Sequence, residues 1–322
     1  MHTLKICILL CLIQALSPLC AQGEELLLRY DSKTGRYTLQ QDFFRIKYYV
    51  DGEHAVPAKD TNKNGIPDCV EDVARQLRVA HHVFCEISGF RSPLRSPRYP
   101  GLAYVDVSML HRSRLRNVNG LAFDKAQSAG DPDNPSARAV VIAIAADLDP
   151  KNNVTPAHEY FHLIQNGMTY FKNTWFYEGM ARWSEDALDI RKMAVPNQAA
   201  VAAMLENPAE LAGLFAMSYN AAQKLWNALG NLCPNASIAL PVDDPILDLT
   251  YSDGTPVMKD RSFTGARMMR EILAGFAAVE HEPFSKHQYG AWSSAVRRDP
   301  RNNPYLVEAI RNTASDVCPP SR

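Results

Sequence analysis

The chain has 322 residues, of which 46% are hydrophobic, so it is long enough to bury one large core or two smaller ones. Its 34 lysines and arginines nearly balance its 35 aspartates and glutamates, which gives a formal net charge of −1. This balance excludes the strongly basic surface that is typical of nucleic-acid-binding proteins, and we expect no nucleic-acid partner.

The N-terminus has the pattern of a secretory signal. One lysine precedes an apolar run from Ile6 to about Leu16, and small and polar residues follow around Ala21. The run is shorter than the roughly 20 residues that span a bilayer, so a retained anchor is the weaker alternative. We expect a signal peptide at residues 1–21, cleaved between about 21 and 23, and a secreted or periplasmic mature protein without stable membrane insertion.

Four cysteines would remain after cleavage: Cys69, Cys85, Cys233 and Cys318. An even number of cysteines in an exported chain predicts disulfides. Four cysteines allow three pairings, and the sequence does not choose among them. Cys69 and Cys85 flank or share one predicted helix, which would keep them too far apart to bond to each other.

A loop with the template of a calcium site follows the first predicted strands. Residues 36–50 are rich in aromatic and β-branched residues and predict one or two strands. The stretch DTNKNGIPDCVE then matches the twelve-residue calcium loop, with Gly65 at its turn. The predicted ligands of a structural Ca²⁺ are Asp60, Asn62, Asn64, the backbone carbonyl of Ile66, Asp68 and Glu71. The alternative is a loop that caps the next helix without a metal.

The order of the remaining elements predicts an α+β protein. Apolar residues at helical spacing predict a helix over 70–88, which Gly89 ends. Strands are predicted at 101–109 and 137–148, the second apolar enough to be buried on both faces. From about Pro196 onward the pattern is mainly helical. Strands first and helices last indicate an α+β fold with an active site between two lobes.

The stretch VTPAHEYFHLIQNG predicts a short helix of about ten residues. Thr155 is a suitable N-cap, Pro156 suits the first helical position, and Asn166 and Gly167 provide a stop signal. This helix follows directly after a predicted buried strand.

The same stretch contains HExxH. His158 and His162 are four residues apart, so they stack on one helix face, where two imidazoles can reach one metal ion. Glu159 is turned enough to meet a water on that metal and to act as its general base. The alternative is a pair of core histidines with ordinary hydrogen-bond partners.

Two carboxylates compete to be the third ligand. Glu178 follows His162 after fifteen residues, and Glu185 lies seven residues further, two helical turns along the same face. Glu178 is followed by glycine, which allows close approach to the first helix, so we prefer it. Glu185 would then accept a hydrogen bond from a ligand histidine. The spacing leaves either carboxylate able to reach the metal, or both on a solvated helix face.

HEYFHLIQ followed by WFYEGMARWSED resembles the gluzincin type of zinc metallopeptidase. The likeness is greatest to exported bacterial proteins assigned as metalloproteases, whose N-terminal half also carries a DxNxNGIPD segment, and it covers roughly residues 40–230. The resemblance implies zinc ligands at His158, His162 and Glu178 and a general base at Glu159. The gap before Glu178 is shorter than in the larger aminopeptidases of this type, which keeps Glu185 open as a ligand.

The resemblance also implies a layout and a further catalytic group. We expect a small mixed sheet and the active-site helix in an N-terminal lobe, residues 24–167, and a mainly helical C-terminal lobe, residues 168–322. Gluzincins commonly stabilise the oxyanion with a tyrosine or histidine from the C-terminal lobe, and Tyr219 is our candidate. Its competitors are Tyr251, His281, His287 and Tyr289.

The sequence as a whole predicts an exported zinc-dependent metallopeptidase that hydrolyses peptide bonds in a protein or peptide substrate. One alternative is a catalytically inactive, calcium-stabilised binding protein of the same fold. Another is a zinc hydrolase of non-peptide esters or amides, which would use the same three ligands. The sequence gives no indication of oligomeric state.

Overall fold

The structure is a computed structural model, and it describes residues 26–189, 207, 212, 213, 215, 216 and 219–319. The expected signal peptide lies outside the described residues. The described residues divide into two compact units, and each is treated by itself. The first unit takes in the described part of Met1–Arg78, Gly101–Pro156 and Asp243–Val257, and the second takes in Val79–Pro100 and the described parts of Ala157–Val242 and Met258–Arg322.

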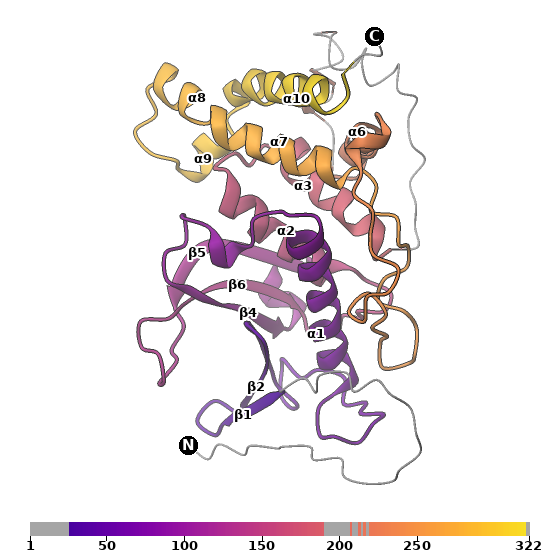
Figure 1. The fold of residues 1–322 in the computed structure, drawn as a ribbon. Coiled ribbons are helices and arrows are strands. Elements are labelled where there is room, and N and C mark those ends of the chain that lie inside the picture. The colour runs from indigo at the N-terminus through magenta and orange to yellow at the C-terminus, as the bar shows by residue number, and fades with distance from the viewer. Residues whose placement is uncertain (1–25, 190–206, 208–211, 214, 217–218, 320–322) are drawn as a thin grey trace. The chain divides into compact units, whose positions relative to one another are not determined.

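A six-stranded mixed sheet forms the first unit (Figure 1). Its strands are β1 (Leu27–Asp31), β2 (Arg36–Gln41), β3 (Phe44–Tyr48), β4 (Leu102–Leu110), β5 (Gly120–Ser128) and β6 (Arg138–Ala145). Their order across the sheet is β1-β2-β3-β4-β6-β5. The neighbours β3, β4 and β6 run parallel, and the outer pairs are antiparallel. The α+β class is therefore confirmed.

Alternation along β3 separates an apolar face from a charged one. Ile46 is fully buried, whereas Arg45 and Lys47 point to the opposite face because side chains alternate along a strand. Both cations reach Asp106 on β4, with Arg45 Nε at 2.7 Å and Lys47 Nζ at 2.6 Å from its carboxylate oxygens. Burial lowers the pKa of Lys47, and Asp106 opposes that change. The paired charges make burial of this face possible.

Helix α1 (Asp68–His81) joins the sheet unit to a distant segment of the chain. Gln76 Nε2 donates to the Pro150 carbonyl at 2.9 Å and to Tyr251 Oη at 2.8 Å. The backbone N–H of Ser252 donates to Asp72 Oδ1 at 2.7 Å. These long-range hydrogen bonds attach residues 243–257 to α1, and these residues therefore belong to the first unit.

The observed units therefore interleave along the chain, and they do not coincide with the consecutive lobes 24–167 and 168–322 expected from the sequence. Most of the helix that carries HExxH belongs to the second unit, although the sequence places it in the N-terminal lobe. The difference arises because buried polar groups such as Gln76 and Asp72 take their partners from residues far along the chain.

Helices make up the second unit. They are α2 (Thr155–Met168), α3 (Thr174–Ser184), α6 (Tyr219–Gly230), α7 (Ala266–Val279), α8 (His281–Lys286), α9 (Ser294–Arg297) and α10 (Asn303–Val317). Helix α1 continues into this unit as a π-helix, His82–Ile87. Helix α3 packs on α6, and α7 packs on α10 (Figure 1).

Large aromatic side chains fill the core between these helices. The rings of Trp175 and Trp226 stack with centroids 6.0 Å apart, and Trp226 Nε1 donates to the Trp175 carbonyl at 3.0 Å. Phe176 meets Phe276 edge to face at 4.7 Å. Such rings bury much apolar area, and their polar edges are satisfied here. The core therefore holds α3 in a fixed position.

One disulfide closes the helical unit. Cys233 and Cys318 are bonded, with their Cα atoms 5.8 Å apart, and they join the segment after α6 to the end of α10. Cys69 and Cys85 are free thiols. Within the described ranges, no helix is both long and apolar enough to cross a bilayer.

Candidate metal centre

Local contacts position the HExxH helix. Helix α2 covers Thr155–Met168, and Asn153 Oδ1 accepts from the Thr155 backbone N–H at 3.0 Å, so Asn153 supplies the side-chain cap. The helix continues past the predicted stop at Gly167. A Cβ on Gly167 would lie 3.2 Å from the Ser96 Cβ, and Ser96 Oγ donates to the Gly167 carbonyl at 2.6 Å. Gly167 thus allows a close approach to Ser96, one residue before the helix ends at Met168.

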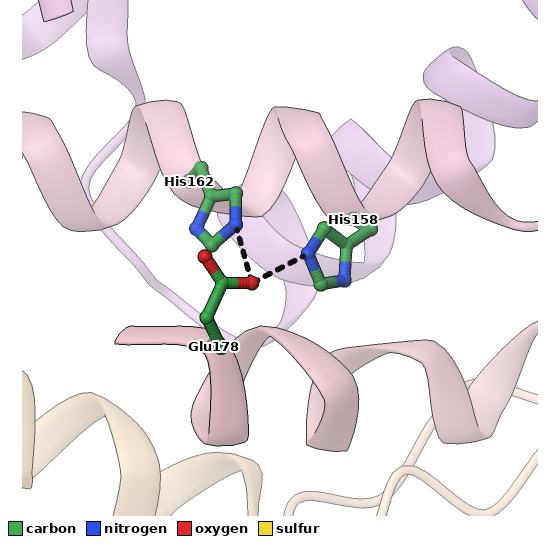
Figure 2. A group of neighbouring side chains, drawn as sticks. All are labelled: His158, His162 and Glu178. Atoms are coloured by element: carbon green, nitrogen blue, oxygen red, sulfur yellow. Dashed lines mark ion pairs between the residues drawn. The ribbon is translucent and has the colours of Figure 1, made fainter. Parts of the chain in front are cut away.

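The structure brings His158, His162 and Glu178 together (Figure 2). Both imidazoles project from α2, and Glu178 projects from α3 toward them. Glu178 Oε2 lies 3.5 Å from Nε2 of His158 and 3.5 Å from Nε2 of His162. One candidate ligand atom from each residue lies within 4.8 Å of the others. This buried group could hold a metal ion.

The spacing within the triad fits a tetrahedral metal. Ligand atoms about 2.1 Å from a tetrahedral ion lie about 3.4 Å from each other, and the distances from Glu178 Oε2 to the two histidine Nε2 atoms are both 3.5 Å. The side chains of His158 and His162 are 6% and 5% exposed, whereas the Glu178 side chain is 27% exposed. The nitrogen ligands are therefore sheltered, and the centre is open to solvent on the carboxylate side.

Each imidazole is also held at its other nitrogen. His158 Nδ1 lies 2.7 Å from Glu185 Oε1, and Arg182 Nη1 contacts the second oxygen of that carboxylate. His162 Nδ1 lies 2.8 Å from Gln165 Oε1. A partner that accepts the Nδ1 proton leaves the Nε2 lone pair for a metal. Both Nε2 atoms face Glu178, as a shared metal would require.

These contacts distinguish the roles of the two competing carboxylates. Glu178 belongs to the group that could hold a metal, whereas Glu185 accepts from His158 on the side away from it. Sequence spacing alone could not separate these roles, since a spacing of seven predicts one shared helix face. In the structure α3 ends at Ser184, and Glu185 begins a 3-10 turn, Glu185–Ala187.

The electrostatics of the triad favour a positive charge at this point. Burial lowers the pKa of His158, but the carboxylates of Glu178 and Glu185 outweigh burial and raise it to about 10. Burial raises the pKa of Glu178, but the two imidazoles outweigh burial and hold it far below its usual value. The carboxylates therefore stabilise a proton or a metal cation among the imidazoles.

Glu159 has the environment expected of a base. Its side chain is buried, and burial raises its pKa, an effect that the imidazoles of His162 and His158 partly oppose. A carboxylate that is poorly solvated accepts a proton more readily than one in water. Glu159 can therefore take up a proton beside the triad.

The calcium-type loop uses its side chains differently. Gly65 has φ +83°, and Asp60 Oδ2 accepts from its backbone N–H at 2.8 Å. The amides of Asn62 and Asn64 donate to Glu71 at 3.1 and 2.7 Å. Asp68 Oδ1 accepts from the Thr61 backbone N–H at 2.8 Å. The carboxylates and amides among the predicted calcium ligands are thus hydrogen-bonded within the loop. The binding of Ca²⁺ stays a prediction for the six ligands Asp60, Asn62, Asn64, Ile66, Asp68 and Glu71.

The candidate oxyanion donor lies outside the described side chains. Tyr219 begins α6, and its side chain is not among those that the structure describes. Two of its competitors have structural partners, because Tyr251 Oη accepts from Gln76 and Tyr289 Oη donates to Asn302. The oxyanion donor stays a prediction.

Three residues that contact the side chains of the centre were not predicted from the sequence. Gln165 contacts His162, Arg182 contacts Glu185, and the Tyr177 ring stacks on the His162 ring with centroids 4.0 Å apart. The spacing of three between His162 and Gln165 was a usable signal, because such residues share a helix face. The Tyr177 contact joins two helices and has no local signal.

No family model matches the chain, and neither the curated proteins nor the solved structures provide a match.

Proposed function

We propose that this chain is an exported zinc metallopeptidase of the gluzincin type, which hydrolyses peptide bonds. The observation that carries the proposal is the convergence of His158, His162 and Glu178 on one point, with the buried Glu159 on the same helix. Two imidazoles and one carboxylate are a ligand set that catalytic zinc uses in peptidases.

The donor set favours zinc over other metals. Imidazole nitrogens suit zinc and other late transition metals, whereas calcium and magnesium prefer oxygen ligands alone. Structural zinc sites have four protein ligands, and catalytic sites have three. The group found among the described residues has three, and its carboxylate is partly exposed. Both features support a catalytic site.

Each protein group then has a defined task. When bound, zinc lowers the pKa of a coordinated water and polarises a carbonyl. His158 and His162 would hold the zinc through Nε2, and Glu178 would hold it through Oε2. The Glu159 carboxylate accepts a proton from the attacking water and passes it to the departing amine nitrogen. Glu185 and Gln165 hold the two imidazoles in orientation.

The proposed substrate is a protein or peptide outside the cytoplasm. The N-terminal signal pattern supports export, and the formal net charge of −1 gives no reason to expect a nucleic acid. A zinc hydrolase of esters or other amides would use the same three ligands. Cleavage of a peptide library separates the two, because an esterase would release no new peptide termini.

A structural Ca²⁺ in the 60–71 loop belongs to the same proposal. The loop matches the calcium template, and Gly65 has the left-handed backbone that the turn of such a loop requires. A cavity of about 310 Å³ lies beside it, lined in part by Asn62, Asp68 and Glu71. Binding would exchange hydrogen bonds within the loop for metal contacts.

Glu159→Gln tests the enzymatic role. The amide cannot accept the proton, so we expect hydrolysis of a denatured protein to fall at least about 1,000-fold, while zinc stays bound. Metal analysis and a cleavage assay measure the two effects on one sample. Glu282→Gln changes an exposed carboxylate on α8 and should leave activity unchanged. Unchanged turnover in Glu159→Gln would exclude the proposed base, and a zinc-bound wild type without any hydrolysis would favour the binding-protein alternative.

A further inference from the structure

Gln165 is a fully buried polar side chain whose two ends have different partners. It is 0% exposed. Its Oε1 lies 2.8 Å from His162 Nδ1, and its Nε2 donates to the backbone carbonyl of Tyr177 at 3.0 Å. Burying an amide costs free energy unless both ends are hydrogen-bonded. Here both ends are used, and each joins a part of the metal centre.

The partner of the amide nitrogen decides the tautomer of His162. A backbone carbonyl can only accept, so the NH₂ group of Gln165 must face Tyr177, and the amide oxygen must face His162. An amide oxygen can only accept, so His162 Nδ1 must carry the hydrogen. His162 Nε2 then has its lone pair directed at Glu178.

The same side chain sets the position of the third ligand. The carbonyl that Gln165 binds belongs to Tyr177, the residue directly before Glu178. The Tyr177 ring also stacks on the His162 ring at an interplanar angle of 6°, and its hydroxyl donates to Asn166 Oδ1 at 3.1 Å. Residues 165 and 166 of α2 therefore fix both ends of Tyr177.

We propose that Gln165 is a positioning residue of the metal centre: it fixes the tautomer of His162 and holds the Glu178 backbone at ligand distance. This inference rests on the proposed metal site. His158 has an unlike partner, because Glu185 accepts from it as a carboxylate. One imidazole is thus oriented by a charged group and the other by a neutral amide that also ties α2 to α3.

Zinc titration of three variants tests the proposal. Gln165→Met keeps the shape of the side chain and removes both hydrogen bonds, so we expect zinc affinity to fall about 10- to 100-fold. Gln165→Glu keeps an acceptor for His162 Nδ1 but loses the donor to the Tyr177 carbonyl, so it should recover only part of the lost affinity. Gln76→Met is the matched control, because Gln76 is also 0% exposed and donates to a backbone carbonyl in the sheet unit. It should lower stability and leave zinc affinity unchanged.

Two further readouts distinguish positioning from a general loss of stability. The absorption bands of the cobalt-substituted protein report ligand geometry and should change in Gln165→Met but not in Gln76→Met. In the metal-free wild type, nitrogen NMR of His162 should show hydrogen on Nδ1. Because this measurement uses the wild type, it does not depend on whether any variant folds.

The possible results are separable. Affinity and cobalt spectrum of Gln165→Met equal to those of the wild type would overturn the role of Gln165 and leave the metal site standing. The opposite tautomer of His162 would do the same. A wild type that binds no zinc would overturn the metal site itself, and the inference with it.

Discussion

The α2–α3 helix pair and the 60–71 loop both present carboxylates, but the two regions use them in different ways. In the helix pair, Glu178 faces two imidazoles whose other nitrogens are already held by Glu185 and Gln165. In the loop, Glu71 accepts from nearby amides and thereby stabilises the loop. In the helix pair, residues outside the triad orient the imidazoles before a metal binds. In the loop, the polar side chains hydrogen-bond to one another.

This difference has an energetic consequence for metal binding. A site whose ligands are oriented in advance loses little free energy to rearrangement when the ion binds. A loop that must give up internal hydrogen bonds loses part of the binding free energy to that exchange. We therefore expect tight binding at the helix pair and weaker binding, of the order seen in extracellular calcium modules, at the loop.

Acid should affect the helical unit and the 60–71 loop through different groups. His81, the last residue of α1, contacts α2, with Nδ1 2.6 Å from Tyr160 Oη, and burial lowers its pKa to about 4 although Glu86 opposes this. Because the folded pKa is below the unfolded value of about 6.5, this stabilisation is complete above pH 6.5 and is lost as the pH falls toward 4. The full effect is about 3 kcal/mol.

His81→Gln removes this titration and tests the account. The stability difference between wild type and variant should shift by about 3 kcal/mol between pH 7 and pH 4, measured by urea unfolding at each pH. His281→Gln, at an exposed position, should run parallel to the wild type. Parallel curves for His81→Gln would contradict the inferred neutral histidine.

The loop should resist the same acid range. Burial raises the pKa of Asp68, but hydrogen bonds from Thr61 and Lys59 outweigh burial, and the pKa is lowered. A lowered carboxyl pKa means that the stabilisation is present above the unfolded value of about 3.8 and is lost only as the pH falls below it. The contrast with His81 makes pH a way to separate the regions.

Calcium should have the smallest effect. With a dissociation constant between about 0.1 and 1 mM, 5 mM Ca²⁺ would raise the free energy of unfolding by about 1–2 kcal/mol. Glu71→Gln removes the carboxylate at the twelfth loop position, so the variant should show no such rise. Magnesium is the control ion, since it demands a tighter octahedral site. Equal unfolding midpoints with and without calcium in the wild type would contradict calcium binding by the 60–71 loop.

Local sequence patterns predicted most of the helices and strands and the two histidines of the metal centre. The spacing of His158 and His162 predicts one helix face, and the structure places both Nε2 atoms near one carboxylate oxygen. The aromatic and β-branched stretch 36–50 became β2 and β3, with Asp42 at positive φ in the turn between them.

Long-range contacts could not be predicted in the same way. The choice between Glu178 and Glu185 depends on how α3 packs against α2, and that packing includes the contact of the Tyr177 ring with the His162 ring. The interleaved units depend on Asp72 and Gln76 bonding to residues about 175–180 positions away. Neither contact has a periodicity that a local pattern could show.

The central claim is that two imidazoles and one carboxylate bind the same ion, and X-ray absorption spectroscopy of the zinc-loaded protein tests it most directly. We expect one zinc per chain, with two imidazole nitrogens and oxygen neighbours about 2.0–2.2 Å away. Glu178→Gln should lose most of the bound zinc, whereas Glu71→Gln should retain it. A wild type without bound zinc, or a zinc shell with sulfur at about 2.3 Å and no imidazole, would contradict the account.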